Sequence, residues 1–346
     1  MSTKVNVGLI GVGRIGQLHC HHLAHLMPDV KVSAVCDFFA DRARDCAAQY
    51  GIPVATDDFR TLLDNQDIDA VFVCSSTDTH AEIISAAADA GKHVFSEKPI
   101  ALDLVSVDRA LVAVERAGVK LQVGFNRRFD CNYARVRQAL KDGEIGTPHI
   151  LHIVSRDPSP PPIEYIRISG GIFLDMTIHD FDMARFLIGA EAEELSAIGG
   201  VMIDEAIGRE GDIDTTIITL RFENGVIGTI DNSRQAVYGY DQRVEVLGSQ
   251  GCICTANAYP NSAVVSTADT VHRDLPLELT VERYRDAYLA EKQAFVDSIL
   301  NDTEPPVTGM DGRAPVVMAY AARKSYEEHR PVNLSEIGSR QEKPGG

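Results

Sequence analysis

A glycine-rich turn near the start of the chain could hold the phosphates of a dinucleotide. Gly11, Gly13 and Gly16 form the pattern G-x-G-x-x-G between an apolar run at 5–10 and a helical pattern. The first glycine permits a tight turn, the second lets backbone amides approach a pyrophosphate, and the third lets the helix pack close to its strand. Because strand, turn and helix follow in this order, the motif predicts a dinucleotide-binding site.

An acidic residue downstream indicates which dinucleotide this would be. Asp37 ends the next apolar run, about 20 residues after the glycine motif, where a carboxylate accepts hydrogen bonds from the ribose hydroxyls. Since it would also repel a 2′-phosphate, Asp37 favours NAD over NADP. Arg42 and Arg44 leave NADP open, because a nearby arginine can neutralise that phosphate.

A lysine follows a later strand at a position where ligands bind. Glu97, Lys98 and Pro99 come directly after the apolar run at 93–95, at the carboxyl end of a predicted parallel strand. Pro99 keeps Lys98 out of helical geometry, and a cis Lys98–Pro99 bond, common at such sites, is a hypothesis. The tripeptide recurs at 342–344, so its position, and not its composition, gives it meaning.

Asp175 and His179 form a second chemical pair. Residues four apart share one face of a helix, so on the predicted helix 173–188 the carboxylate would lie beside the imidazole and tune its basicity. A histidine titrates in the range needed to take a proton from an alcohol. His21 and His25 also have this spacing and could be a metal pair, but no acid or cysteine is placed to complete the set, and the chemistry predicted here requires no metal.

Together these motifs resemble the Gfo/Idh/MocA oxidoreductase family, over nearly the whole chain. In that family the E-K-P lysine and a D-x-x-x-H pair form the catalytic site, which implies Lys98, Asp175 and His179 here. The segments 124–130, 156–158, 178–182 and 233–243 resemble its inositol 2-dehydrogenase branch. The resemblance implies NAD-dependent oxidation of a cyclic polyol, with myo-inositol giving the 2-keto inosose. His179 would be the general base, Lys98 would stabilise the developing oxyanion, and Asp175 would orient both.

The resemblance also implies a set of binding residues. The expected cofactor contacts are Gly11, Gly13, Arg14, Ile15, Asp37, Ser75, Glu97 and Lys98, and the expected substrate contacts are Asn126, Arg127, Asp157 and Tyr238, with Tyr284 a weaker candidate. Members commonly carry Met at the position of Asn126, so the preferred polyol stays open. Alternatives are a scyllo-inositol or aldose dehydrogenase of the same family, or a non-catalytic dinucleotide or sugar sensor.

The element pattern predicts an α/β domain followed by an α+β domain. Up to residue 125, apolar runs at 5–10, 30–36, 69–74, 93–95 and 121–125 alternate with helical patterns at 15–27, 40–50, 58–65, 80–90 and 104–117. This alternation is typical of a doubly wound parallel sheet, a Rossmann domain over 1–125. Residues 126–335 are expected to form a substrate-binding and oligomerisation domain with an open, mostly antiparallel sheet, and 336–346 a polar tail. Asn224 and Gly225 predict a hairpin in that sheet.

Composition narrows the function classes. The chain has 346 residues, 33 basic and 50 acidic, and a formal net charge of −17, which argues against a nucleic-acid partner. It contains no long apolar run of membrane-spanning length and no C-x-x-C pair among seven cysteines. We therefore expect a cytoplasmic protein with no membrane partner and no disulfide framework. An uncovered sheet face and the resemblance both predict a homo-oligomer, specifically a tetramer.

Overall fold

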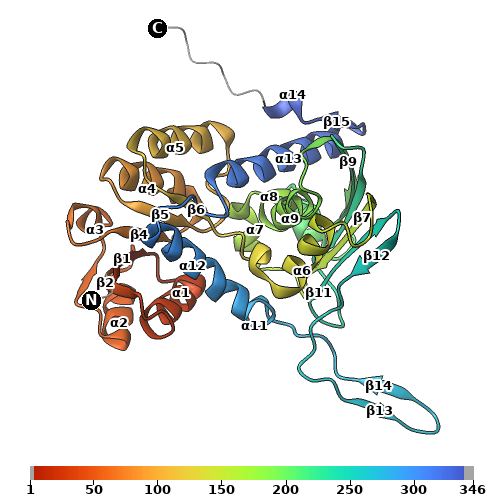
Figure 1. Ribbon diagram of the computed structural model, residues 1–346, viewed down its shortest axis with the longest axis horizontal. Coiled ribbons are helices and arrows are strands. Elements are labelled where there is room, and N and C mark those ends of the chain that lie inside the picture. Colours follow the sequence, from red (N-terminus) through yellow and green to blue (C-terminus); the bar gives the residue numbers. More distant parts are fainter. Residues whose placement is uncertain (1–3, 339–346) are drawn as a thin grey trace. The chain divides into compact units, whose positions relative to one another are not determined.

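The computed structural model describes residues 4–338, which form two compact units. The first unit contains the chain up to Asn126 together with Tyr288–Val316, and the second contains Arg127–Ala287 together with the chain from Val317 onward (Figure 1). Within the described residues, no helix is both long enough and apolar enough to cross a membrane.

The first unit is built on a six-stranded parallel sheet in the order β3-β2-β1-β4-β5-β6. The predicted Rossmann sheet is thereby confirmed. Its strands are β1 (Val5–Ile10), β2 (Val30–Cys36), β3 (Val54–Thr56), β4 (Ala70–Val73), β5 (His93–Ser96) and β6 (Leu121–Val123). The sequence analysis did not predict β3, because three residues are too few to show a period.

Helices connect these strands as right-handed crossovers require. They are α1 (Arg14–His25), α2 (Ala40–Tyr50), α3 (Arg60–Asp64), α4 (Thr77–Asp89) and α5 (Leu104–Ala117). Gly51 and Gly118 end α2 and α5 in the left-handed conformation, with φ of 66° and 67°. These two helices have the predicted bounds, since the glycines stop them where the pattern stops.

A late segment of the chain completes the first core. α12 (Arg285–Leu300) places Phe295 and Val296 in the same buried cluster as Phe72 and Phe95. The Phe295 ring lies 5.6 Å from that of Phe72, edge to face. The predicted boundary, which assigned all of 126–335 to one domain, therefore differs from the structure: the apolar face of α12 covers the parallel sheet.

The second unit contains a seven-stranded sheet in the order β12-β11-β7-β10-β9-β8-β15. Only the β10–β7 pairing is parallel, so the expectation of a mostly antiparallel sheet is confirmed. The strands are β7 (Pro148–Arg156), β8 (Ala192–Gly200), β9 (Thr215–Phe222), β10 (Ile227–Ser233), β11 (Asp241–Gly248), β12 (Gly251–Cys254) and β15 (Val332–Asn333). A separate hairpin, β13 (Val264–Ser266) with β14 (Val271–Arg273), extends from this unit (Figure 1). The sequence analysis did not predict β8, which is rich in small and charged residues.

The helices of the second unit differ most from expectation. They are η1 (Asn126–Phe129), α6 (Cys131–Lys141), α7 (Ile163–Ser169), α8 (Ile172–Asp175), α9 (Ile178–Ile188), α10 (Glu205–Arg209), α11 (Thr280–Arg283) and α14 (Ser335–Gly338), together with the part of α13 (Gly309–Glu328) from Val317 onward. The single helix predicted over 173–188 is wrong, because the chain breaks between α8 and α9. The expected tail begins inside α14, and its residues 339–346 lie outside the described chain.

Candidate active site

The glycine turn has the geometry that a bound pyrophosphate requires. Gly11 has φ of +91°, and a Cβ there would lie 2.5 Å from the Ser75 backbone nitrogen. A Cβ on Gly16 would lie 2.0 Å from the Gly11 oxygen, whereas a Cβ on Gly13 would meet nothing within 4 Å. The outer glycines are thus required by packing, and the middle one leaves the approach to the turn open.

The amino terminus of α1 is available to an anion. Gly13 precedes the helix, and no side chain in the described chain caps it. Arg14 is exposed and Ile15 is half-buried beside this terminus. The first backbone amides of the helix and its dipole therefore favour a phosphate at this position.

Asp37 is placed to recognise a ribose. One carboxylate oxygen accepts a hydrogen bond from Val12 N at 2.8 Å and the other from Phe39 N at 3.0 Å. Each oxygen keeps a lone pair for a hydroxyl. Of the two arginines that left NADP open, Arg44 pairs with Asp41, and the Arg42 guanidinium lies 4.4 Å from the centre of the Phe39 ring. The residues present fit NAD, whose ribose hydroxyls Asp37 would bind.

Ser75 and the Lys98–Pro99 segment are linked through one buried histidine. The His80 ring lies 3.1 Å from the Ser75 carbonyl oxygen and 2.8 Å from that of Pro99. The Ser75 hydroxyl is 2.7 Å from that of Thr79. The Lys98–Pro99 bond is cis, as hypothesised, and Lys98 is half-buried.

Glu97 has a partner that the sequence analysis did not foresee. Its carboxylate lies 2.6 Å from Nε2 of His19, a fully buried residue of α1. Burial, chiefly, lowers the pKa of His19 to about 4, so the ring is neutral and donates to Glu97. Burial raises the pKa of Glu97, but the hydrogen bond from His19 and the positive charges of Lys98 and Lys292 outweigh it, and the net direction is downward. His19 thus fixes Glu97, the residue before Lys98.

Asp175 lies at the end of α8 between two donors. One carboxylate oxygen accepts a hydrogen bond from the Tyr165 hydroxyl at 2.8 Å, and the other is 3.4 Å from the Arg234 guanidinium. Arg234 is 1% exposed and also reaches Asp212 at 3.4 Å. The sequence analysis gave Arg234 no role, although its place directly after a strand and near acidic residues was a usable signal.

His179 is half-buried in the first turn of α9, separate from the helix that carries Asp175. At the break, Thr177 N donates to Ile172 O at 2.9 Å and His179 N donates to Met176 O at 3.3 Å. The argument that the pair shares one continuous helix face is therefore incorrect. Local backbone bonds and the Thr177 hydroxyl, which donates to Asn232 at 2.6 Å, shape this turn instead.

A buried polar network holds both sides of the break. Asp180 accepts from Arg127 at 2.6 Å and from Asn232 at 2.9 Å, and all three side chains are at most 5% exposed. Ser155 O also accepts from Asn232, at 3.2 Å. Arg127, expected from the resemblance to contact substrate, is thus directed at Asp180, and the sequence analysis missed the part that Asp180 and Asn232 play.

The remaining predicted substrate residues occupy different surroundings. Burial, followed by the negative charge of Asp175, raises the pKa of Asp157 to about 6, which associates Asp157 with the Asp175 site. Tyr238 instead donates to Asp241 at 2.6 Å and accepts from Arg156 at 3.1 Å, and it is 37% exposed.

Asn126 is 2% exposed, and its Nδ2 has no hydrogen-bond partner among the described residues. Tyr284 is 1% exposed, within the buried network.

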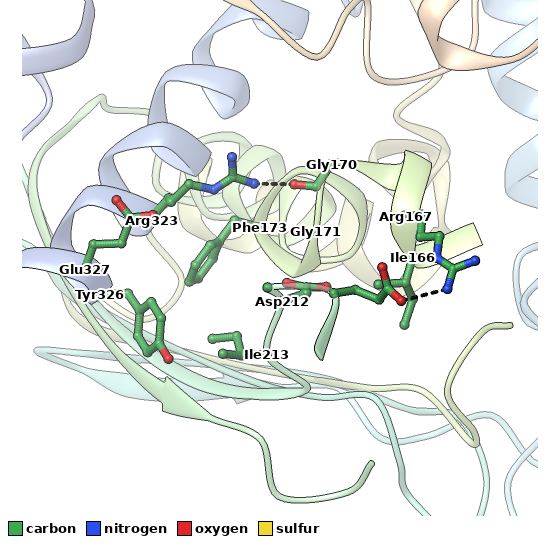
Figure 2. Close-up of a pocket in the computed structure, with 12 residues that line it drawn as sticks. Ile166, Arg167, Gly170, Gly171, Phe173, Asp212, Ile213, Arg323, Tyr326 and Glu327 are labelled. Carbon is green, nitrogen blue, oxygen red and sulfur yellow. Dashed lines mark hydrogen bonds and ion pairs between the residues drawn. The ribbon is translucent and has the colours of Figure 1, made fainter. Parts of the chain in front are cut away.

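A cavity of about 290 Å³ lies beside this region of the second unit (Figure 2). Gly171 and Asp212 line it, Arg323 donates to the Gly170 carbonyl at one side, and Arg167 pairs with Glu210 at 2.8 Å at the other. None of the predicted substrate residues lines this cavity. We therefore do not assign the polyol to it.

Comparisons with known proteins agree with the geometry. Residues 5–125 match a family model described as an oxidoreductase family with an NAD-binding Rossmann fold, and 133–254 match the GFO/IDH/MocA C-terminal domain. The chain is 47% identical to myo-inositol 2-dehydrogenase of Thermotoga maritima (96% of this chain, 99% of the relative) and 44% identical to inositol 2-dehydrogenase of Rhizobium meliloti (96% and 99%). A solved scyllo-inositol dehydrogenase of Lactobacillus casei, with bound NAD(H) and scyllo-inositol, aligns with a TM-score of 0.90 at 30% identity (96% and 99%). The chain belongs to the GFO/IDH/MocA oxidoreductase family.

Proposed function

We propose that this protein uses NAD to oxidise a ring hydroxyl of a cyclic polyol, converting myo-inositol to the 2-keto inosose. The observation that carries the proposal is the similarity, over nearly the full length, to relatives named as inositol 2-dehydrogenases. The Asp37 carboxylate supports NAD as the cofactor, and the α1 terminus supports pyrophosphate binding. NAD supplies the hydride acceptor.

Three side chains carry the proposed proton chemistry. His179, a half-buried imidazole, removes the proton of the hydroxyl that is oxidised, since a neutral ring nitrogen can accept it. Lys98 donates a hydrogen bond to the same oxygen and stabilises its growing negative charge. Asp175, held by Tyr165 and Arg234, balances these two basic groups.

The binding roles follow from the surroundings of each residue. Gly11, Gly13, Arg14, Ile15, Asp37 and Ser75 are proposed to surround the dinucleotide, whereas Glu97 acts through His19 to position Lys98. For the polyol, Asn126 offers a buried donor without a partner in the described chain, and Asp157 offers a carboxylate. Arg127 acts indirectly through Asp180, and Tyr238 contributes a half-exposed hydroxyl.

Substitution of the catalytic residues tests these roles. His179→Ala and Lys98→Ala should each lower kcat by about 10²- to 10⁴-fold, the range expected for loss of a general base or an oxyanion donor, with NAD affinity little changed. His272→Ala and Lys141→Ala are suitable controls, because both residues are exposed, on β14 and α6. Normal NAD reduction by either catalytic variant would overturn the site assignment.

A substrate panel separates the proposed activity from its nearest rival. The scyllo-inositol dehydrogenase relative, bound to its substrate, makes that isomer the second candidate. NAD reduction should be fastest with myo-inositol, slower with scyllo-inositol and slowest with glucose. Turnover of glucose alone would exclude both inositol activities.

We also propose that the protein is a cytoplasmic homotetramer. Strand register places Ile198, Ile217, Ile227 and Leu247 on one face of the seven-stranded sheet, and their exposed fractions are 68%, 47%, 52% and 42%. Exposed apolar side chains on a sheet face are expected to be buried against another copy. The seven cysteines are all free thiols, as in a reducing compartment. Light scattering that gives a monomer mass would contradict the assembly.

A further inference from the structure

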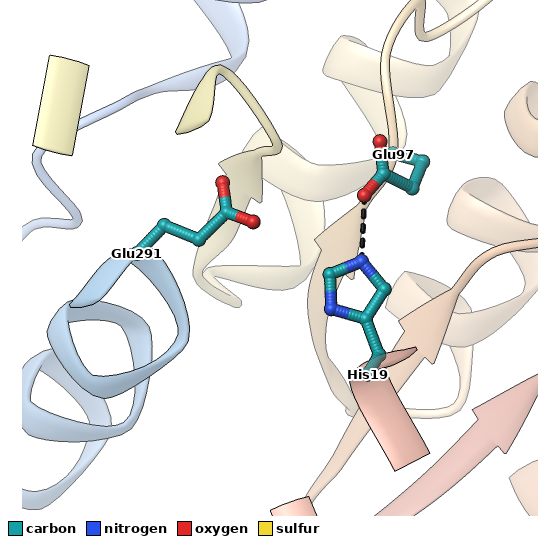
Figure 3. Close-up of side chains that lie close together, drawn as sticks. All are labelled: His19, Glu97 and Glu291. Atoms are coloured by element: carbon teal, nitrogen blue, oxygen red, sulfur yellow. Dashed lines mark hydrogen bonds and ion pairs between the residues drawn. The ribbon is translucent and has the colours of Figure 1, made fainter. Parts of the chain in front are cut away.

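Three buried side chains from distant parts of the sequence converge in the first unit. His19 comes from α1, Glu97 follows β5, and Glu291 comes from α12 (Figure 3). One ring nitrogen of His19 and one carboxylate oxygen from each glutamate all lie within 4.8 Å of one another. His19 and Glu291 are 0% exposed, and the Glu97 side chain is 15% exposed.

This cluster has more hydrogen-bond acceptors than donors. Both carboxylate oxygens of Glu291 and Nδ1 of His19 are buried without a hydrogen-bond partner in the described part of the chain. Gln122 Oε1 is a further buried acceptor without a partner there, while its Nε2 donates to the Glu291 backbone oxygen at 2.6 Å. His19 Nε2 already donates to Glu97. Buried polar groups are normally paired, so a group that attracts lone pairs belongs at this position.

We propose that His19, Glu97 and Glu291 bind a divalent first-row transition-metal ion. One imidazole nitrogen and two carboxylate oxygens form a donor set suited to ions such as Zn²⁺ or Mn²⁺. The spacing fits after small side-chain shifts, because ligands bound at about 2.0–2.2 Å lie roughly 3–3.5 Å apart. Burial raises the pKa of Glu291 well above its ordinary value, so the ion would displace the proton of Glu291, and the two carboxylates would then supply the charge that offsets the desolvation of the ion.

Lys292 is a positive group that interacts with all three side chains of this cluster, and Lys98 also interacts with Glu97. The Lys292 ammonium donates to the Tyr288 carbonyl one turn earlier in α12 and lies 5.6 Å from the Tyr288 ring centre. Its charge opposes a bound cation. Lys292→Met should therefore tighten metal binding.

The ion would have a structural role, apart from the hydride chemistry. Its ligands come from α1, the segment after β5 and α12, so binding would cross-link the glycine-turn helix to the late helix of the same core. Glu97 also directly precedes Lys98. The ion would thus stiffen the support of Lys98 without contacting substrate.

The test uses Co²⁺ as the probe, with the full-length protein after chelator treatment and dialysis. His21 and His25 are exposed with rings 5.3 Å apart, so they could bind metal adventitiously and are removed first as His21→Ala/His25→Ala. This background should bind one equivalent of Co²⁺, show visible d–d absorption bands, and release the ion to Zn²⁺. Calorimetry and the absorption spectrum give stoichiometry and coordination separately.

Ligand substitution in the same background completes the test. Glu291→Gln should weaken Co²⁺ binding at least tenfold and alter the bands, whereas Glu205→Gln, an exposed helix residue, should leave both unchanged. If Glu291→Gln does not fold, the Co²⁺ stoichiometry of the His21→Ala/His25→Ala protein alone tests the proposal. Less than 0.2 equivalents bound, or binding unaffected by Glu291→Gln, would overturn the proposal. Because the readout is metal binding, its failure leaves the proposed dehydrogenase activity untouched.

Discussion

Two buried polar clusters, one in each unit, differ in how well their groups are paired. In the second unit, Asp180 has a donor for each oxygen, from Arg127 and Asn232, and Asn232 in turn accepts from Thr177. In the first unit, Glu291 has a donor for neither oxygen within the described residues. Asp180 and Glu291 are both 0% exposed, so burial of these carboxylates alone does not distinguish the clusters.

This difference in hydrogen-bond pairing distinguishes a structural network from a candidate ligand site. A fully paired network fixes one conformation, because any rearrangement leaves a buried group unsatisfied. The network around Asp180 therefore suits the fixed turn that precedes His179. A cluster with surplus acceptors has capacity for another group, as in our proposal for His19, Glu97 and Glu291.

The largest expected effect comes from breaking the paired network at Asp180. Asp180→Ala leaves the Arg127 guanidinium buried without its carboxylate, which should lower the free energy of unfolding by about 3–5 kcal/mol. Urea denaturation measures the change. Glu205→Ala is the control, since that carboxylate is 94% exposed and pairs with Arg209 at 3.9 Å, where a loss below about 1 kcal/mol is expected. Equal losses in both variants would contradict the scaffold role.

The next effect is a pH dependence at Asp157. Its folded-state pKa is about 6, above the ordinary value of 3.8, so the native state holds a proton that the unfolded state has released. Stability from this group is present below pH 4 and is lost as pH rises through 6, by roughly 2 kcal/mol. Asp157→Asn should therefore match the wild type near pH 4 and exceed it near pH 8. If the unfolding free energies of the variant and the wild type differ by the same amount at pH 4 and pH 8, the pKa of Asp157 is not raised by folding.

Thr177→Val tests the turn itself at nearly constant volume. The variant leaves the Asn232 amide oxygen buried without its donor, at a cost of about 1–2 kcal/mol in unfolding free energy. Because the turn precedes His179, kcat should also fall while KM for NAD is unchanged. Thr303→Val, at an exposed position after α12, should alter neither quantity. If Thr177→Val changes KM for NAD and leaves kcat unchanged, the turn does not support His179.

The smallest effect is expected where the acceptors already lack partners. In chelator, Glu291→Gln should leave the unfolding free energy unchanged or raise it by up to about 1 kcal/mol, since the amide adds donors among buried acceptors. Thermal unfolding with and without chelator measures this. A loss above about 2 kcal/mol in chelator would mean that the Glu291 carboxylate is paired after all.

The sequence predicted best those features that depend on local chemistry. The glycine turn, the strand before it and the bounds of α2 and α5 follow from backbone requirements of nearby residues, and the structure confirms them. The return of α12 to the first core and the partner of Glu97 depend on contacts between residues far apart in the chain. No local pattern encodes such contacts, so they could not be read from one sequence.

The candidate site shows the same division. The residue types at Lys98, Asp175 and His179 indicated acid–base chemistry, and their family was confirmed. The helical spacing of Asp175 and His179 suggested one helix, but tertiary hydrogen bonds from Thr177 and Asp180 produce a break there. The helical spacing of residue types reflects only nearby positions in the chain. The hydrogen bonds that interrupt the helix are made to residues of β10 and η1.

The proposed polyol oxidation is tested most directly by following a labelled hydrogen. The purified protein is incubated with NAD and myo-inositol that carries deuterium on the carbon of the hydroxyl to be oxidised, and the reduced cofactor is analysed by mass spectrometry. We predict one deuterium in each molecule of NADH and a slower rate than with unlabelled myo-inositol. NADH without deuterium, or no NADH at all, would contradict the account.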